Sequence, residues 1–260
     1  MPEEDCKHTY LNEIYDKTVH VGHTIPRSIV VFGQTGSGKS SIINMLVGSS
    51  VADVSPGAAG CTPSNKPYRI SRGDDNCYTL WDTPGLNEAE EGTVSAQDAA
   101  HNLLDLVEHH GVNLLIYCIR GRVADIIRVN YDLFCKIKSM EKVPIVLVVT
   151  GLEGKMDEWW RENKKDLKKM EMVFAGYACI TSWKGKGGIY EDEYKESAEK
   201  VWELVKEHST PKPWHMTPGT LSCSKPQAKE RILAYAKNTV RLKLGSGIRK
   251  FLMRLLSLTQ

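Results

Sequence analysis

Long apolar runs are missing from this sequence. It contains no stretch of about 18 consecutive apolar residues, so no segment is expected to span a membrane. Paired C-x-x-C motifs are also missing, and the seven cysteines are scattered, which predicts the reduced, mostly buried thiols of a cytosolic protein. The first residues, MPEEDCKHTY, are acidic and polar and do not predict a signal peptide. We therefore expect a cytoplasmic protein.

Acidic residues are scarce near the C-terminus. Residues 225–260 contain nine lysines and arginines against one acidic residue, Glu230. This segment therefore carries a formal charge of +8, and because the whole chain is at +2, the rest is at −6. The 260 residues, with 41% hydrophobic and 25% charged side chains, are typical of one soluble domain plus an appendage.

Strand-like apolar runs alternate with helix-like patterns through most of the chain. The predicted strands are 28–32, 66–70, 78–81, 113–119, 143–150 and 177–181, and the predicted helices are 39–47, 97–109, 125–138, 157–172 and 192–207. The second and third strands flank the turn SRGDDN and predict an antiparallel hairpin. This alternation favours an α/β fold with a mainly parallel six-stranded sheet, one antiparallel edge strand and helices on both faces.

The chain divides into four predicted parts. They are an N-terminal extension (1–26), the α/β domain (27–208), a proline-rich linker (209–226) and a basic amphipathic helical tail (227–260). The linker STPKPWHMTPGTLSCSKP contains four prolines, which interrupt the alternation of strands and helices.

A glycine-rich motif lies between the first predicted strand and the first predicted helix. Residues 33–40 read GQTGSGKS and match the P-loop pattern G-x-x-x-x-G-K-[ST]. In a P-loop, backbone N–H groups converge on phosphate oxygens, the lysine neutralises phosphate charge and the hydroxyl can bind Mg²⁺. A strand-to-helix turn without a ligand is the alternative. The expected phosphate-binding residues are Gly33, Gln34, Thr35, Gly36, Ser37, Gly38, Lys39, Ser40 and Ser41.

A second motif, LWDTPG, ends the third predicted strand. Asp82 would hold Mg²⁺ through a water molecule, and the backbone N–H of Gly85 would sense a γ-phosphate. An ordinary turn at a strand end is the alternative for D-T-P-G alone. Downstream of a P-loop, the motif favours a nucleotide switch in which hydrolysis releases the segment after Gly85.

Together these motifs resemble those of a GTPase. The segments that carry a closer resemblance are GCTP before an antiparallel strand, VVFGQTGSGKSSIINML, LWDTPGLNEAEEGTV and PIVLVVTGLEG. They are similar to segments of the AIG-type (paraseptin) GTPases, including GIMAP and plastid Toc proteins, and most of all to those of fungal AIG-like G-domain proteins. The resemblance covers residues 27–208 and implies a P-loop NTPase G domain that hydrolyses GTP to GDP and phosphate with Mg²⁺. Thr62 would be the first-switch threonine, binding Mg²⁺ beside Ser40 and Asp82.

The motif that reads the base departs from the superfamily pattern. In place of N/T-K-x-D after the fifth strand, this chain has TGLE. Thr150 matches, Gly151 replaces the lysine that covers the purine, and Glu153 replaces the aspartate. A glutamate still offers guanine two acceptor oxygens, one methylene farther out. Guanine is favoured, with adenine as the alternative.

A second base loop is predicted at ITSWKG, which resembles the S-A-K motif of GTPases. Ser182 would lie near guanine O6, and Trp183 or Lys184 would stack on or cover the base. The alternative for Trp183 is a hydrophobic plug.

The catalytic position also departs from the pattern of Ras-like enzymes. Those carry a glutamine after D-T-x-G that orients the attacking water, whereas Leu86 stands here and forms no hydrogen bond through its side chain. The resemblance implies face-to-face dimers in which an arginine after the fourth strand reaches the partner's nucleotide. Arg120 or Arg122 is the candidate for this role, and the alternative is a surface arginine that pairs with Asp125 or a helix end.

The tail GIRKFLMRLLSLTQ predicts an amphipathic basic helix. Its apolar face would contain Ile248, Phe251, Leu252, Leu255 and Leu258. Three interpretations stay open: packing on the domain or a dimer partner, contact with an anionic membrane surface, and binding of nucleic acid, which is the least favoured.

The sequence thus predicts a slow GTPase that uses GTP, GDP and Mg²⁺ and forms homodimers across the nucleotide face. The competing hypothesis, favoured by Leu86, is a GTP-regulated scaffold with negligible turnover at a membrane. A P-loop kinase is a third hypothesis, which the threonine switch and the D-T-P-G turn disfavour.

Overall fold

The computed structural model describes residues 25–52, 65–72, 76–85, 106–107, 109–121, 123, 127–128, 130–131 and 143–215. The strands are β1 (Arg27–Gly33), β2 (Lys66–Ser71), β3 (Cys77–Asp82), β4 (Leu114–Arg120), β5 (Ile145–Thr150) and β6 (Gly176–Cys179). The helices are α2 (Lys39–Val47), α5 (Met156–Lys169) and α6 (Glu191–His208), with a short 3-10 turn, η2 (Lys186–Gly188). None of the described helices has the length and apolar composition needed to cross a lipid bilayer.

The six strands form one sheet in the order β2-β3-β1-β4-β5-β6. The edge strand β2 runs antiparallel to β3, and the other neighbouring pairs are parallel. This confirms the expected mainly parallel sheet with one antiparallel edge strand. The central strand β1 lies between β3 and β4. The chain therefore adds β2 and β3 on one side of β1 and then β4, β5 and β6 on the other side. Ligands of parallel α/β sheets bind at such a point, beyond the carboxyl ends of the strands.

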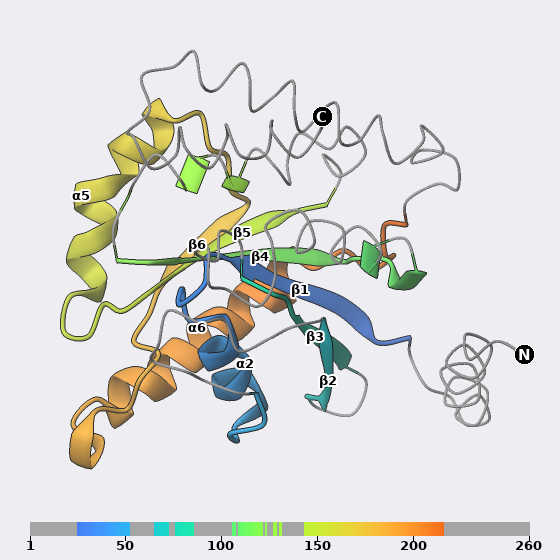
Figure 1. The fold of residues 1–260 in the computed structure, drawn as a ribbon, viewed down its shortest axis with the longest axis horizontal. Coiled ribbons are helices and arrows are strands. Elements are labelled where there is room, and N and C mark those ends of the chain that lie inside the picture. Colours follow the sequence, from blue (N-terminus) through green and yellow to red (C-terminus); the bar gives the residue numbers. More distant parts are fainter. Residues whose placement is uncertain are drawn as a thin grey trace, which may run out of the picture.

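Helices cover both faces of the sheet, as the sequence predicts (Figure 1). Because side chains alternate along a strand, Ile29 and Val31 of β1 face α2 and α6, whereas Val30 and Phe32 belong to the cluster packed against α5. Strands β4 and β5 divide in the same way, and their side chains are buried on both faces. The buried hydrophobic clusters on the two faces of the sheet hold the central strands in place. They thereby also position the carboxyl ends of these strands.

The described element bounds differ from the predicted ones by a few residues, with one clear cause at α5. This helix ends at Lys169 instead of residue 172, because Glu171 adopts a positive φ of 54°, which a right-handed helix does not accommodate. The predicted helices 97–109 and 125–138 are described only in part, at 106–107 with 109–110 and at 127–128 with 130–131, all of them helical. Residues 1–24 and 216–260 lie outside the described residues, so the tail interpretations stay predictions.

A buried asparagine joins the segment after α6 to the start of the sheet. Asn113 is 1% exposed, and its Oδ1 accepts a hydrogen bond from Ser28 N at 2.7 Å. Its Nδ2 donates to Thr210 O at 2.7 Å. Backbone bonds between Val112 and Trp214 continue this contact. Residues 209–214 therefore pack against the start of β4, a contact that the proline content of this segment does not predict.

We expect Asn113→Ala to lower the free energy of unfolding by about 2–3 kcal/mol, because it leaves the buried N–H of Ser28 and the half-buried carbonyl of Thr210 without the partners that Asn113 supplies. Urea unfolding measures the change. The matched control is Asn163→Ala, which removes an amide bonded to Trp159 O within α5, for which about 0.5 kcal/mol or less is expected. Equal effects of the two variants would contradict this role of Asn113.

Candidate functional site

The carboxyl ends of the parallel strands meet at one edge of the sheet. Gly33 of β1 is in register with Cys118 of β4, and Arg120 of β4 is in register with Thr150 of β5. The glycine-rich loop leaves β1 at this edge and enters α2 at Lys39. Every described residue that the sequence assigned to phosphate, metal or base lies at the end of β1, β3, β5 or β6 or in the segment that follows that strand.

The glycine-rich loop lies so close to its neighbours that a side chain would clash at Gly33 and be strained and crowded at Gly38. A Cβ on Gly33 would lie 2.2 Å from the carbonyl oxygen of Cys118. Gly38 has a φ of 94°, and its Cβ would meet the side chain of Thr150 at 3.0 Å. A hydrogen bond from Ser37 N to Gln34 O at 3.1 Å closes the turn. The glycine spacing therefore serves close packing of the loop on β4 and β5.

The side chain of the loop lysine, Lys39, folds back over the loop. Lys39 is 7% exposed, and its Nζ donates to the carbonyl oxygens of Gln34 at 2.9 Å and Gly33 at 3.3 Å. A buried ammonium group is costly unless oxygen atoms surround it. This arrangement holds a positive charge directly above the loop.

Two hydroxyl groups of the loop are buried without a hydrogen-bond partner among the described residues. They are Thr35 Oγ1 and Ser37 Oγ. Buried polar groups of a native protein are nearly always paired, so such orphans indicate a ligand or an ordered water. Thr35 Oγ1 lies against Gly85 and Ser37 Oγ against Gly33, so both orphans belong to the loop that the sequence assigned to phosphate.

The metal-binding residues expected from the sequence lie together in the described part. Ser40 Oγ donates to Asp82 Oδ2 at 2.7 Å, and Asp82 is 1% exposed. A hydroxyl and a carboxylate are oxygen donors of the kind that Mg²⁺ prefers, so this pair fits the cation. Thr62, the third expected ligand, lies outside the described residues.

The D-T-P-G segment is packed onto the glycine-rich loop. A Cβ on Gly85 would lie 2.0 Å from Thr35 Oγ1 and 2.7 Å from Thr35 Cα. Thr83 Oγ1 donates to Val31 O at 2.9 Å, which ties the segment to β1. Gly85 therefore lies directly against the loop expected to hold phosphates. Leu86, the next residue, lies outside the described residues.

Two side chains hold the carbonyl oxygen of Ser37. Cys118 Sγ donates to it at 2.8 Å and Thr150 Oγ1 at 2.7 Å. Burial raises the pKa of the Cys118 thiol to about 12, so the thiol remains a donor. The sequence placed Cys118 in a buried strand but did not predict this contact, because a lone cysteine in an apolar run resembles any core residue.

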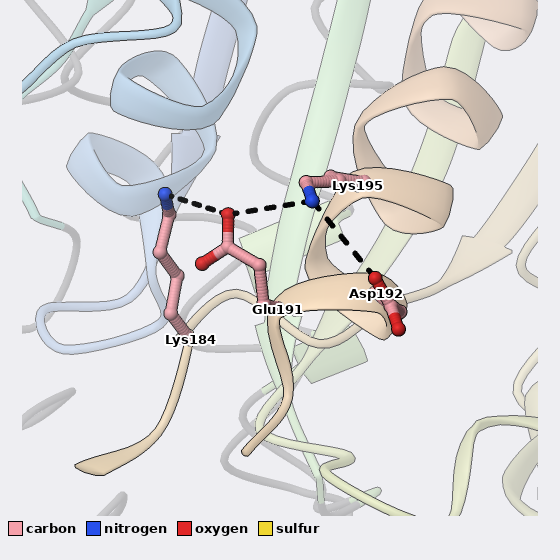
Figure 2. Close-up of polar contacts among 4 residues, drawn as sticks. All are labelled: Lys184, Glu191, Asp192 and Lys195. Atoms are coloured by element: carbon pink, nitrogen blue, oxygen red, sulfur yellow. Dashed lines mark hydrogen bonds and ion pairs between the residues drawn. The ribbon is translucent and has the colours of Figure 1, made fainter. Parts of the chain in front are cut away.

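The two loops expected to read the base lie at the carboxyl ends of β5 and β6. Glu153 is half-buried in the turn that precedes α5, and Ser182 is half-buried after β6. Trp183 is 58% exposed, so it is not the hydrophobic plug that the sequence left as an alternative. Lys184 Nζ lies 3.1 Å from Glu191 Oε1 at the start of α6, as Figure 2 shows. Lys184 is thereby drawn toward α6, whereas the indole of Trp183 is accessible.

The arginine expected to act across a dimer lies beside the first base loop. Arg120 is exposed at the end of β4, and its Cγ and Nε lie 3.1 Å from the point where a Cβ on Gly151 would stand. Its side chain thus packs over the residue that replaces the usual lysine. Arg122 and Asp125 lie outside the described residues.

Comparison with known proteins decides the fold. Residues 28–151 match the profile of a family described as 50S ribosome-binding GTPase. A crystal structure of an Era variant from Aquifex aeolicus, bound to GDP and aluminium fluoride, superposes with a TM-score of 0.54 at 19% sequence identity, covering 73% of this chain and 59% of that one. The chain has the P-loop GTPase fold.

Two curated proteins are related to this G domain in sequence. GTPase Der of Rhodopseudomonas palustris is 29% identical over 133 residues, which are 50% of this chain and 27% of Der. The tRNA modification GTPase MnmE of Ralstonia nicotianae is 25% identical over 180 residues, 62% of this chain and 36% of MnmE. The chain thus spans about a quarter to a third of the length of the curated relatives it matches. The finer likeness to AIG-type proteins stays a prediction.

The two donors to Ser37 O differ in how their contribution to stability depends on pH. In the unfolded chain the thiol has a pKa of 9.0, whereas the folded pKa of Cys118 is about 12. Between these values the folded state keeps a proton that the unfolded state loses, so the thiol's contribution falls as pH rises above about 9. We expect Cys118→Ala to cost about 1–2 kcal/mol at pH 7, and that cost to shrink by about 1 kcal/mol between about pH 8 and pH 10.

Urea unfolding at several pH values measures this difference. Thr150→Val is the matched control, because it removes the other donor to Ser37 O but has no titrating group. Its cost should be about the same at each pH. A cost of Cys118→Ala that stays constant up to pH 10 would contradict the raised pKa.

Proposed function

We propose that this G domain binds GTP and, with Mg²⁺, hydrolyses it to GDP and phosphate. The observation that carries the proposal is the contact between Ser40 Oγ and Asp82 Oδ2, 2.7 Å long, beside the buried Lys39. It brings the hydroxyl of the P-loop motif and the carboxylate of the D-T-P-G motif to one point at the edge of the sheet. A structural turn requires neither this pair of oxygens nor a buried lysine next to it.

Different groups of the glycine-rich loop would bind the phosphates and the cation. Backbone N–H groups of the loop, apart from that of Ser37, which closes the turn, would donate to phosphate oxygens. Lys39 would exchange its carbonyl contacts for the β- and γ-phosphates. Ser40 and Asp82, with Thr62, would hold Mg²⁺. When bound, the cation neutralises charge that develops on the phosphate oxygens.

Base recognition is assigned to Glu153 and Ser182. A carboxylate after β5 can accept two hydrogen bonds from the N1 and N2 groups of guanine, which adenine does not offer in that geometry. Thr150 and Gly151 complete the first loop, and the exposed indole of Trp183 is available to stack on a base. We therefore infer a preference for guanine over adenine.

Nucleotide-dependent dimerisation is the second part of the proposal. In this account two G domains pair across their nucleotides, and Arg120 or Arg122 of one chain completes the site of the other. The exposure of Arg120 at the edge of the site supports this role. The remaining proposals are an AIG-type assignment, a cytoplasmic location and contact of the basic tail with a membrane surface. Nucleic acid is the least favoured partner from the sequence, although the matched family is described as ribosome-binding and MnmE as a tRNA modification GTPase.

A GTP-regulated scaffold with negligible turnover is the competing function. Leu86 supports it, because it stands where Ras-like enzymes carry a glutamine that orients water. Both functions use the same nucleotide site, and they differ in whether phosphate is released.

We expect phosphate release from GTP but not from ATP, with Mg²⁺ required and activity per chain rising as the protein is concentrated. The rise follows from mass action, since a site completed by a partner is active only in the dimer. The measurement is phosphate release over a wide range of protein concentration. Lys39→Ala is the control and should lower the rate about 100-fold or more. Tight GTP binding without release would favour the scaffold, and failure to bind GTP would refute both functions.

Mixing two inactive variants tests whether the arginine acts across the dimer. Arg120→Ala retains a nucleotide site but lacks the arginine, whereas Lys39→Ala retains the arginine but lacks a working P-loop. If the arginine acts in trans, the mixture regains activity well above the sum of the separate variants. The same pairing with Arg122→Ala identifies which arginine is used. Averaging in both mixtures, in samples where the two variants are shown to associate, would show that neither arginine acts in trans.

A further inference from the structure

One carboxylate connects the two loops that flank the expected base site. Glu193 lies in the first turn of α6, and its Oε2 accepts a hydrogen bond from Thr181 Oγ1 at 2.8 Å. The same oxygen accepts a second bond from the backbone N–H of Gly154 at 3.2 Å. Thr181 precedes Ser182, and Gly154 follows Glu153. Glu153 and Ser182, the two residues expected to recognise the base, are therefore sequence neighbours of residues that donate hydrogen bonds to Glu193.

The bonds to Glu193 attach these loops to a rigid support. Strand β5 ends at Thr150 and strand β6 at Cys179, so Gly154 and Thr181 lie beyond the paired strands, although Ile180 N still donates to Val149 O at 2.8 Å. Helix α6 is anchored in the core by buried side chains, including Val201 and Val205 at 0% exposure. Glu193 therefore ties both loops to the first turn of this helix.

The Thr181 side of this contact is well ordered by burial. Thr181 is 0% exposed, and its backbone N–H donates to Ser197 Oγ at 3.0 Å. Ser197 lies one turn after Glu193 on the same helix and is also fully buried. A buried hydroxyl that loses its acceptor is costly, so Thr181 and Glu193 constrain each other.

Neighbouring charges on α6 do not supply the same link. Figure 2 shows Glu191 between Lys184 and Lys195, and Lys195 beside Asp192. The side chains in these pairs are 36% exposed or more, and pairs of this kind contribute little to stability. They also contact only one of the two base loops, through Lys184. Among the described residues, Glu193 is the side chain shown to bond both.

We propose that Glu193 is a positioning residue for base recognition. It does not touch the nucleotide, but it holds Glu153 and Ser182 at the spacing that a guanine ring requires. This inference rests on the proposed function, because it assumes that these two residues read the base. It predicts that loss of Glu193 weakens discrimination between bases and leaves the phosphate site intact.

The test compares the dissociation constants of GDP and ADP, with Mg²⁺, for the full chain and its variants by calorimetry. Glu193→Ala should weaken GDP binding about 10-fold and change ADP binding by about 2-fold or less, because two hydrogen bonds that order the base loops are lost. Glu193→Gln should recover most of the affinity, since its amide oxygen still accepts. Glu203→Ala, an exposed acid on the same helix, is the matched control and should match the wild type.

A second pair of variants changes Thr181, the donor of the hydrogen bond to Glu193. Thr181→Val removes the donor and should reproduce the loss of GDP preference, whereas Thr181→Ser keeps the hydroxyl and should not. These variants answer the question even where Glu193→Ala does not fold.

The outcomes separate this inference from the function on which it rests. A wild type that prefers GDP, together with Glu193→Ala and Thr181→Val variants that keep that preference, would overturn the inference alone. Equal weakening of GDP and ADP would also overturn it, because it would show a general structural role. A wild type that does not prefer GDP would overturn both the guanine assignment and the inference.

Discussion

The position of the glycine-rich loop depends on the carbonyl oxygen of Ser37. Cys118 of β4 and Thr150 of β5 both donate to it, and the absence of side chains at Gly33 and Gly38 lets the loop come close enough for these bonds. Because both donors project from strands that are buried on both faces, the loop takes its shape from the sheet. Phosphate binding at such a loop benefits from a backbone that is already fixed, and these two hydrogen bonds brace the loop by fixing the carbonyl of Ser37 without a ligand.

The charged groups of the site follow from the same bracing. Lys39 and Asp82 are almost fully buried, and each is held by oxygen or hydroxyl groups of the loop and of α2. Their charges are opposite, as a site for a polyphosphate and its divalent cation requires. Farther along the same edge, Glu193 links the loops after β5 and β6. The loop expected to hold phosphates is thus braced by the sheet, whereas α6 links the loops expected to hold the base, which is why changes at Glu193 should leave phosphate binding intact.

Sequence reasoning recovers the features that depend on local spacing. The P-loop, the D-T-P-G segment and the alternation of strands and helices are encoded over short distances, and the structure places them as expected at one sheet edge. Contacts between distant segments were not predictable: Cys118 with Ser37, Glu193 with Gly154 and Asn113 with Thr210 join residues that no local pattern relates. The early end of α5 was missed for another reason, since the positive φ of Glu171 is uncommon for a residue other than glycine.

The central claim is that one edge of the sheet forms a complete guanine nucleotide site. Hydrogen exchange of the full chain, with and without GDP and Mg²⁺, tests it most directly, because it reports each segment without requiring turnover. The account predicts slower exchange in residues 33–41 and 82–85, at the phosphate end, and in 150–154 and 181–184, at the base end. Protection of the phosphate end without the two base loops, or no protection at this edge at all, would contradict it.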